Sequence, residues 1–200
     1  MPTAIADLIT IDDISSFKAP VGGLGSDEQT ALTSFIPFAI AYIQDRLGHT
    51  IKETAYSQFV NTQSSQLVVL PSYPVNPATI TLTVQGSAWT LLSTASIITA
   101  TGHAWLDSEW GMVHVTDALF PKGYGKIFVA MTAGWGGTYP YPVDLKLAAV
   151  ILTMLFEQER QRVGVKAKTV GPESISEYIR NSSDYKTAVE SAIMRHTRII

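Results

Sequence analysis

The stretch from Lys126 to Val163 constrains the fold more than any other part of this chain. It begins with apolar and β-branched residues typical of a strand, turns through a corner rich in glycine and proline, and opens a helix at Val143. Ten consecutive residues of that helix, Leu147 to Phe156, carry no charge. A helix that is apolar all round must be covered all round, by a core or by another subunit. Ten residues are too few to span a bilayer, for which about 20 are needed.

The uncharged run contains four large side chains that occupy more than one side of the helix. Because they cannot all face a single core, we predict that they form a contact between subunits, and that an aspartate placed among them weakens assembly. Burial against the chain's own β-sheet accounts for the same pattern equally well. The four predicted interface residues are Val150, Ile151, Met154 and Leu155.

The composition is typical of a protein that covers part of its surface with partners. Of the 200 residues, 46% are hydrophobic and only 16% are charged, so the chain needs a large core or a covered surface. The net charge of −3 does not indicate a general nucleic-acid binder. The absence of cysteine excludes disulfide scaffolds and thiolate zinc sites. We see no signal peptide and no membrane-length apolar segment, and expect a soluble, intracellular assembly.

Capping signals predict two helices near the N-terminus. Thr10 and Asp13 have the spacing of a capping box and predict a short helix. Ser26 and Gln29 form a second such signal, and apolar residues at helical spacing follow it. Gly48 is a natural residue to end this second helix, because it tolerates the left-handed conformation found there.

Short strands are expected in the middle of the chain, and helices return after them. A polar segment follows the long helix, and a last helix is expected from Asp184 to His196. The sequence therefore predicts an α+β domain with N-terminal helices, a central antiparallel β-sheet region, a long apolar helix and a C-terminal helical tail. The predicted strands, rich in β-branched residues and separated by proline, glycine and serine, are 66–70, 79–84, 111–115 and 126–132.

No pattern of residues points to catalysis. None of the four histidines shares a predicted helix with a second histidine or a carboxylate at metal-ligand spacing, and no known nucleophile or phosphate-binding motif is present. The polar group of His103, Asp107 and Glu109 is better explained as an ordinary loop. The acid pairs at 12–13 and at 157 and 159 indicate solvated charge. We therefore expect no catalytic residue, no metal and no cofactor.

Aromatic residues offer one alternative function. Trp89, Trp105 and Trp110, together with Tyr124, would form a sugar-binding surface if they shared one face. Packing in a core or an interface is the simpler explanation of these side chains. A carbohydrate-binding β-domain is therefore the alternative to an assembly protein, and an enzyme is the least favoured class.

Four segments share features with one family of proteins, and they do so in the same order along the chain. They are a helix end at 41–48, the turn Leu70-Pro71-Ser-Tyr-Pro74-Val75, the strand 79–84, and the corner Gly134-Trp135 that leads into Val143-Asp-Leu-Lys-Leu-Ala.

In this order, the segments resemble the head–tail connector (head-completion adaptor) proteins of tailed bacteriophages, over about residues 27–162. The resemblance implies a virion protein that forms a twelve-fold ring below the portal and extends the DNA channel. Its partners would be further copies of itself, the portal protein and the next neck or tail protein, with no membrane involved. Genomic DNA would pass through the lumen without specific binding, and assembly would take place in the host bacterial cytoplasm.

We divide the chain into an N-terminal arm (1–25), a connector core (26–163) and a C-terminal extension (164–200) that docks onto the portal. The apolar face of the last helix is too small to stabilise an isolated helix, and basic residues near it could steer it to an acidic partner. Packing of this helix against its own domain is the alternative. The predicted docking residues are Tyr185, Lys186, Val189, Ile193, Arg195, Arg198, Ile199 and Ile200.

Overall fold

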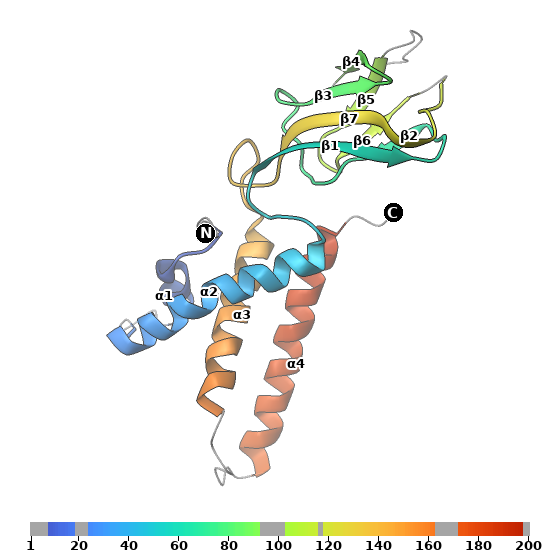
Figure 1. Ribbon diagram of the computed structural model, residues 1–200. Coiled ribbons are helices and arrows are strands. Elements are labelled where there is room, and N and C mark those ends of the chain that lie inside the picture. Colours follow the sequence, from blue (N-terminus) through green and yellow to red (C-terminus); the bar gives the residue numbers. More distant parts are fainter. Residues whose placement is uncertain (1–7, 19–23, 93–102, 116–117, 163–171, 198–200) are drawn as a thin grey trace. The chain divides into compact units, whose positions relative to one another are not determined.

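The computed structural model describes residues 8–18, 24–92, 103–115, 118–162 and 172–197. Contacts divide the chain into two units, which are described separately (Figure 1). The helical unit comprises Met1–Gly48 and Tyr141–Ile200, and the sheet unit comprises His49–Pro140. The helical unit thus combines residues from both ends of the chain. The assignment of separate functions to an arm, a core and an extension stays a prediction.

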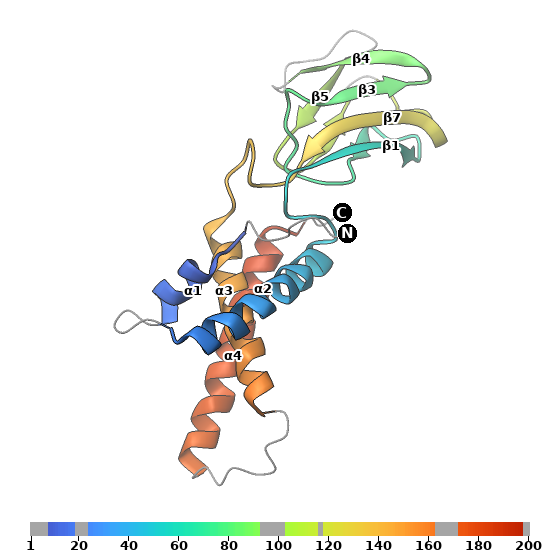
Figure 2. The ribbon, with the colours of Figure 1, turned by 60° about the vertical axis from the view of Figure 1, so that its left-hand side comes forward.

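Four helices form the described part of the helical unit. α3 and α4 run side by side, α2 crosses them, and α1 contacts α2 and α3 (Figures 1 and 2). None of the helices among the described residues is long and apolar enough to cross a membrane. The bounds are α1 Ile11–Lys18, α2 Ser26–Leu47, α3 Val143–Arg162 and α4 Pro172–Arg195.

Local side-chain chemistry explains where the first two helices begin and end. The capping box of α1 is confirmed, since the Thr10 N–H donates to Asp13 Oδ2 at 2.7 Å and the Asp13 N–H donates to Thr10 Oγ1 at 3.3 Å. The second capping box is wrong, because Gly25 is the N-cap of α2 without a side-chain cap, and Ser26 is already helical. Gly48 ends α2 as predicted, with a left-handed φ of 76°.

α3 is long, but it is not the apolar helix that the sequence pattern indicates. Charged turns flank its uncharged run, and Val143 and Leu147 are 81% and 44% exposed. The helices that contact α3 are α1, α2 and α4, so the helical unit itself covers most of the run. The buried apolar residues of α3 are Leu145, Ala148, Ala149, Val150, Ile151, Leu152 and Leu155.

α4 is longer than predicted. It begins at Pro172, whereas the sequence pattern predicts a helix only from Asp184. Proline suits the first helical position, because its missing N–H has no partner within the helix there. In the polar segment before Asp184, Ile175, Tyr178 and Ile179 are at helical spacing (i, i+3, i+4), a short signal that predicts the earlier start and was overlooked.

Seven strands form a mixed, nearly closed sheet in the order β1-β7-β3-β4-β5-β6-β2, and the terminal strands β1 and β2 contact each other. The prediction of an antiparallel sheet is wrong for β4 and β5, which pair in parallel. Parallel neighbours need a crossover connection, which local sequence pattern does not reveal. The bounds are β1 Thr54–Thr62, β2 Leu67–Val69, β3 Thr81–Val84, β4 Ser87–Leu92, β5 His103–Asp107, β6 Met112–His114 and β7 Gly123–Ala133.

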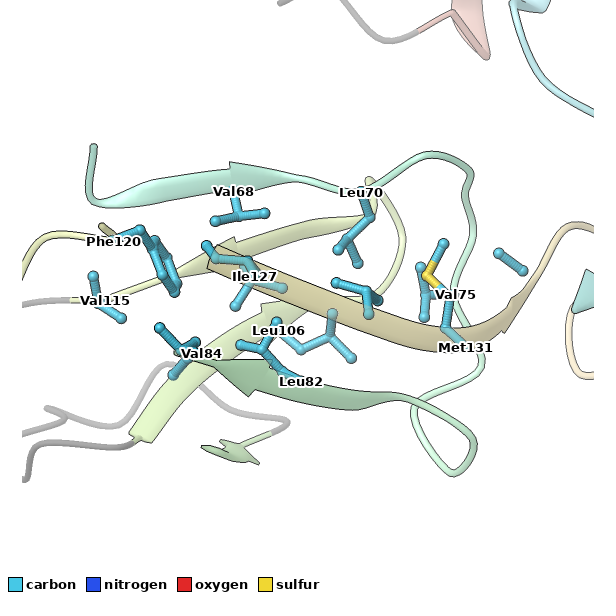
Figure 3. Packing of buried hydrophobic residues seen from close by; sticks show 14 residues of the cluster. Val68, Leu70, Val75, Leu82, Val84, Leu106, Val115, Phe120, Ile127 and Met131 are labelled. Atoms are coloured by element: carbon cyan, nitrogen blue, oxygen red, sulfur yellow. The ribbon is translucent and has the colours of Figure 1, made fainter. Parts of the chain in front are cut away.

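An apolar core fills the interior of the sheet unit (Figure 3). In the second half of β7, from Ile127 to Ala133, alternate residues are buried, which is the period of a strand with one face inward. Val68 of β2 and Leu82 of β3 meet β7 in the same interior (Figure 3). Phe120 is fully buried there. The sheet unit is therefore a layer of strands folded around its own hydrophobic centre.

Candidate functional site

The predicted subunit-interface residues lie on α3, and most of them are already covered within one chain. Val150, Ile151 and Leu155 are 5%, 8% and 9% exposed. Met154 is half-buried. Burial inside the helical unit is sufficient to explain why these side chains are apolar. Their role between subunits stays a prediction.

A small groove lies where α1, α3 and α4 meet. Its cavity measures about 80 Å³, and Ile151, Met154 and Leu155 line it from α3. Tyr185, one of the predicted docking residues, lines it from α4 and is 47% exposed. The structure therefore brings members of both predicted sets to one place. The other lining residues are Phe17 and Gln158.

A larger groove lies between α2, α3 and α4, with a cavity of about 290 Å³. Two of the predicted docking residues, Lys186 and Val189, line it from α4. Its lining combines apolar side chains with charged ones, which suits a protein segment better than a small polar substrate. The remaining lining residues are Tyr42, Leu152, Leu155, Phe156, Glu159 and Glu190.

Three hydrogen-bonded side chains connect α2 to α4 beside this larger groove. Tyr42 Oη donates to Glu190 Oε1 at 2.7 Å, and Arg46 Nη2 lies 3.5 Å from the same oxygen. Arg46 also donates to Tyr42 Oη at 3.2 Å and lies over the Tyr42 ring. The hydrogen bond to Glu190 is the main cause that raises the pKa of Tyr42, because a phenolate would lose this bond and face a carboxylate. This group fixes α4 to its own unit.

A second polar contact connects the end of α4 to the start of α3. His196 Nε2 lies 2.9 Å from Asp144 Oδ1, and Arg195 Nη1 lies 3.8 Å from Asp144 Oδ2. Asp144 belongs to the first turn of α3, where the helix dipole favours a negative charge. Arg195 was predicted to pair with the portal, and in this structure it has an acidic neighbour in its own chain.

The other predicted docking residues differ in their exposure. Val189 and Ile193 are each 2% exposed, so the apolar face of α4 packs on its own unit, as the alternative interpretation has it. Tyr185 and Lys186 are exposed. Arg198, Ile199 and Ile200 lie outside the described residues.

Glu157 is not the solvated acid that its sequence context indicates. Its side chain is 4% exposed, and its two oxygens accept hydrogen bonds from Arg160, each at 2.9 Å. A bidentate guanidinium contact of this kind offsets the cost of burying a carboxylate. Asp12, Asp13 and Glu159 are exposed, as predicted.

The aromatic residues of the sugar-binding alternative do not share one surface. Each of them contacts a different aromatic ring, and Trp89 packs against the core. Among the described residues these four therefore form no common platform, and no group of three or more acids and histidines there could hold a metal ion. The ring pairs are Trp89 with Phe120, Trp105 with His114, Trp110 with Tyr73, and Tyr124 with Phe59.

The residues that hold α4 in place give only a partial signal in the sequence. Tyr42 and Arg46 are four residues apart, a spacing that puts both on one face of a helix and could have indicated a polar contact there. Nothing in the sequence pairs them with Glu190, which is 148 residues from Tyr42. The same holds for Asp144 and His196, which are 52 residues apart.

Solved structures of similar fold exist. One is described as the neck of an empty GTA particle computed with C6 symmetry, and matches with a TM-score of 0.52 and 18% identity over 99% of this chain and 94% of that one. Another, the virion of a native gene transfer agent (GTA) particle, matches with a TM-score of 0.51 and 17% identity over 100% and 94%. No family model and no curated protein matches the chain. At such identities the likeness is one of fold, and it agrees with the resemblance to connector proteins found in the sequence.

Proposed function

We propose that this chain is a structural protein of the neck of a phage-like particle, where its copies form a ring that joins the portal to the neck or tail. The observation that carries this proposal is the similarity of fold to a GTA neck structure along 99% of the chain, at a TM-score of 0.52. The order of connector-like segments in the sequence supports it independently of the fold.

The proposed role is association, which needs no catalytic residue, metal or cofactor. The partners would be further copies of the chain, the portal protein and the next neck or tail protein, in a virion assembled in the host bacterial cytoplasm. DNA would pass through the ring without being held, and the net charge of −3 supports this, because a positively charged lumen would retain phosphates. Tight DNA binding that weakens with added salt would contradict this part of the proposal.

A ring of identical subunits needs two different surfaces on each subunit, because its contacts run head to tail and close on themselves. One of the structures of similar fold was computed with C6 symmetry, and the family resemblance implies twelve subunits. Contacts on two sides also account for a charged fraction of only 16%, since much of the surface would be covered in the assembly.

Light scattering after size-exclusion chromatography tests the proposal most directly. The purified chain would be measured alone, and electron microscopy would follow it on portal-bearing capsids. We expect closed rings in at least one of these conditions. A chain that stays monomeric in both, or a monomer that binds polysaccharide, would contradict the proposal.

The α3 interface is tested by Met154→Asp, because Met154 is half-buried and lines a groove that is open at the surface. An unpaired charge in a subunit contact should weaken ring assembly. Ile151→Asp is a poorer probe, since Ile151 is buried in the chain's own core and the variant should unfold. Val143→Asp, at an 81% exposed position of the same helix outside the groove, is the matched control. Normal rings from a folded Met154→Asp variant would show that α3 is not the interface.

Portal docking is tested at the accessible predicted residues. Deletion from Asp184 onward would remove the buried Val189 and Ile193 and so disrupt the helical unit. Two milder changes avoid this problem. One is Tyr185→Ser with Lys186→Glu, and the other ends the chain after Thr197. If either protein keeps its helical circular dichroism but no longer binds portal-bearing capsids, docking is supported, and normal binding by both would refute it.

A further inference from the structure

Strands β2 and β6, and Trp105 on β5, carry apolar side chains on the outer side of the sheet as well as on its inner side. Val68, Leu106 and Val113 point into the core and are buried. The residues that alternate with them point outward and are again largely apolar, whereas a strand with one solvated face carries polar residues there. An outward apolar surface of this kind indicates a partner. This surface, the β6 face, comprises Leu67, Val69, Trp105, Met112 and His114, all of them partly exposed.

Strand register gathers these side chains into one patch. Leu67 pairs with His114, and His114 pairs with Trp105, so one row crosses three strands. The rings of Trp105 and His114 stack with their centroids 4.7 Å apart. Val69 pairs with Met112 in the next row. Because cross-strand neighbours on one face contact each other, the β6 face is continuous.

The other end of the strand order carries a second outward patch, which is aromatic. Phe59 of β1 pairs with Phe128 of β7, with ring centroids 5.2 Å apart, and the Tyr124 ring lies 6.1 Å from Phe59. Phe59 and Tyr124 are 45% and 75% exposed. Lys126 alternates with the buried Ile127 and so shares the outward side of β7. We name this surface, comprising Phe59, Tyr124, Lys126 and Phe128, the β7 face.

The two faces belong to different strands of the nearly closed sheet. Val68 of β2 and Ile127 of β7 enter the same core from different strands (Figure 3). In the strand order β7 and β6 are separated by β3, β4 and β5 on one side, and by β1 and β2 on the side where the sheet nearly closes, so the two faces are centred on different parts of the sheet unit. A subunit with two unlike patches on different surfaces can contact a different neighbour through each, as a head-to-tail ring requires.

Four of the seven charged residues of the sheet unit accompany the two faces. Lys126 belongs to the β7 face, and the exposed Lys122 precedes the same strand. Asp107 lies on β5 two residues after Trp105, and the exposed Glu109 lies in the turn between β5 and β6. Positive charge therefore accompanies the aromatic patch, and negative charge accompanies the β6 face. The two faces are complementary in charge as well as in apolar character.

We propose that the β6 face of one copy binds the β7 face of the next copy around the ring, with Lys122 and Lys126 facing Asp107 and Glu109. This inference rests on the proposed ring and identifies the surfaces that form it. The apolar patches supply burial, and the charges set the direction. Contact between two β7 faces would bring lysines together, so the head-to-tail arrangement is favoured over a symmetric dimer.

Cysteine cross-linking tests the direction, because the chain has no cysteine of its own. Rings, free or formed on portal-bearing capsids, would be treated with a short bis-maleimide. The double variant Lys126→Cys with Glu109→Cys should give a ladder of covalent oligomers up to the size of the ring. Each single variant alone should give monomer, and a mixture of the two should stop at dimers. Dimers from a single variant would overturn the head-to-tail arrangement.

Charge reversal tests the contact itself. Lys126→Glu should raise the midpoint concentration of assembly about tenfold or more, since it places like charges opposite each other. Adding Glu109→Lys to the same chain should restore assembly, because every contact then carries the reversed pair. Lys146→Glu, on α3 and outside both faces, makes the same change of net charge and should have little effect. A Lys126→Glu variant that assembles like the control would overturn the proposal.

The outcomes also separate this inference from the proposed function. If rings form without a cross-linked ladder, and if both charge reversals leave assembly unchanged, the β6–β7 contact is refuted and the neck role remains. A chain that forms no ring, free or on portal-bearing capsids, would refute the neck role and this inference together.

Discussion

The sheet unit and the helical unit reach their folds by different means. The sheet unit is one continuous stretch, His49–Pro140, with only seven charged residues, and an apolar core fills it. The helical unit joins both ends of the chain, and polar pairs such as Tyr42 with Glu190 and Asp144 with His196 connect its distant segments. Burial alone can order a continuous stretch of chain. A unit assembled from two separate segments has a larger loop to close, and side-chain pairs across the join help to offset that cost.

The unfolding of the two units can be followed separately, because each unit contains a different optical probe. All four tryptophans lie in the sheet unit, and the described α-helices lie in the helical unit. Tryptophan fluorescence therefore reports on the sheet unit, and helical circular dichroism reports on the helical unit. Coincident denaturation curves from the two probes would show that both units unfold in one cooperative transition, and the two units would then not differ in stability.

The largest expected effect is on the core of the sheet unit. Phe120→Ala removes a fully buried ring that packs 5.6 Å from the Trp89 ring, and should cost about 3–5 kcal/mol of the free energy of unfolding. The loss should be seen in fluorescence-detected denaturation. Leu119→Ala, at a neighbour that is 60% exposed, is the control and should have little effect. Equal losses for the two variants would show that Phe120 is not part of a tight core.

The next largest effect is expected from a substitution at a tightly packed glycine of the sheet unit. Gly134 has a φ of +119°, and a Cβ there would lie 2.7 Å from the Lys52 carbonyl oxygen. Gly134→Ala should therefore destabilise the sheet unit by about 1–3 kcal/mol, again measured by fluorescence. Gly125→Ala is the matched control, because Gly125 also has a positive φ but has open space around it. If both variants lose the same stability, conformation alone matters and the close approach does not.

The polar contact between α2 and α4 should have a smaller effect, confined to the helical unit. Tyr42→Phe removes the hydrogen bond to Glu190 and should cost about 1 kcal/mol, detected by circular dichroism but not by tryptophan fluorescence. Tyr185→Phe, at an exposed position of α4, is the control. An equal shift in both probes would mean that the two units unfold together.

The same contact predicts a dependence on pH. The pKa of Tyr42 is raised above its ordinary value of 10.0, chiefly by its hydrogen bond to Glu190, so the folded state holds this proton more tightly than the unfolded state. The contribution is complete below pH 10.0 and is lost as the pH rises through the higher pKa of the folded state. Tyr42→Phe should remove this alkaline loss of helical stability, and an unchanged profile would contradict the assignment.

The smallest effect is expected where α4 meets the start of α3. Asp144→Asn weakens the contacts with His196 and Arg195, and should cost about 0.5 kcal/mol, because all three side chains are partly exposed to water. The measurement is helical circular dichroism in denaturant, with Asp184→Asn as the control at an exposed site. If Asp144→Asn lowers the free energy of unfolding more than Tyr42→Phe does, the contact at Asp144 stabilises the position of α4 more than the contact at Glu190.

Local chemistry allowed part of the fold to be predicted. The capping box at Thr10 and the glycine end of α2 at Gly48 depend on residues that are neighbours in sequence, and both are confirmed. The predictions of antiparallel pairing for β4 and β5 and of a solvated acid at Glu157 were wrong. Strand pairing depends on segments that are distant in sequence, whereas the Arg160 partner of Glu157 is only three residues away. The early start of α4 was missed although Ile175, Tyr178 and Ile179 recur at helical spacing, because polar residues surround this short signal.

The candidate site was less predictable than the fold. Apolar residues on α3 indicated a contact, but an apolar side chain looks the same whether its own chain or a neighbour covers it. Val150 and Val189 prove to be buried within one chain, so their pattern alone could not distinguish the two cases. The outward apolar surface of β6 could be identified only from the strand register and burial, which put Met112 on the outer side of the sheet and the buried Val113 on the inner side.

The insertion of the sheet unit between α2 and α3 has a consequence for protein synthesis. α2 leaves the ribosome before its packing partners on α3 and α4 have been made, and at about 5–20 residues per second the delay is roughly 5–20 s. During that time the apolar side chains of Leu32, Ile36 and Ile43 have neither α3 nor α4 to cover them, although they are buried in the finished protein. The nascent chain therefore exposes an amphipathic helix that chaperones can bind, and the yield of folded protein should depend on how fast the intervening strands are translated.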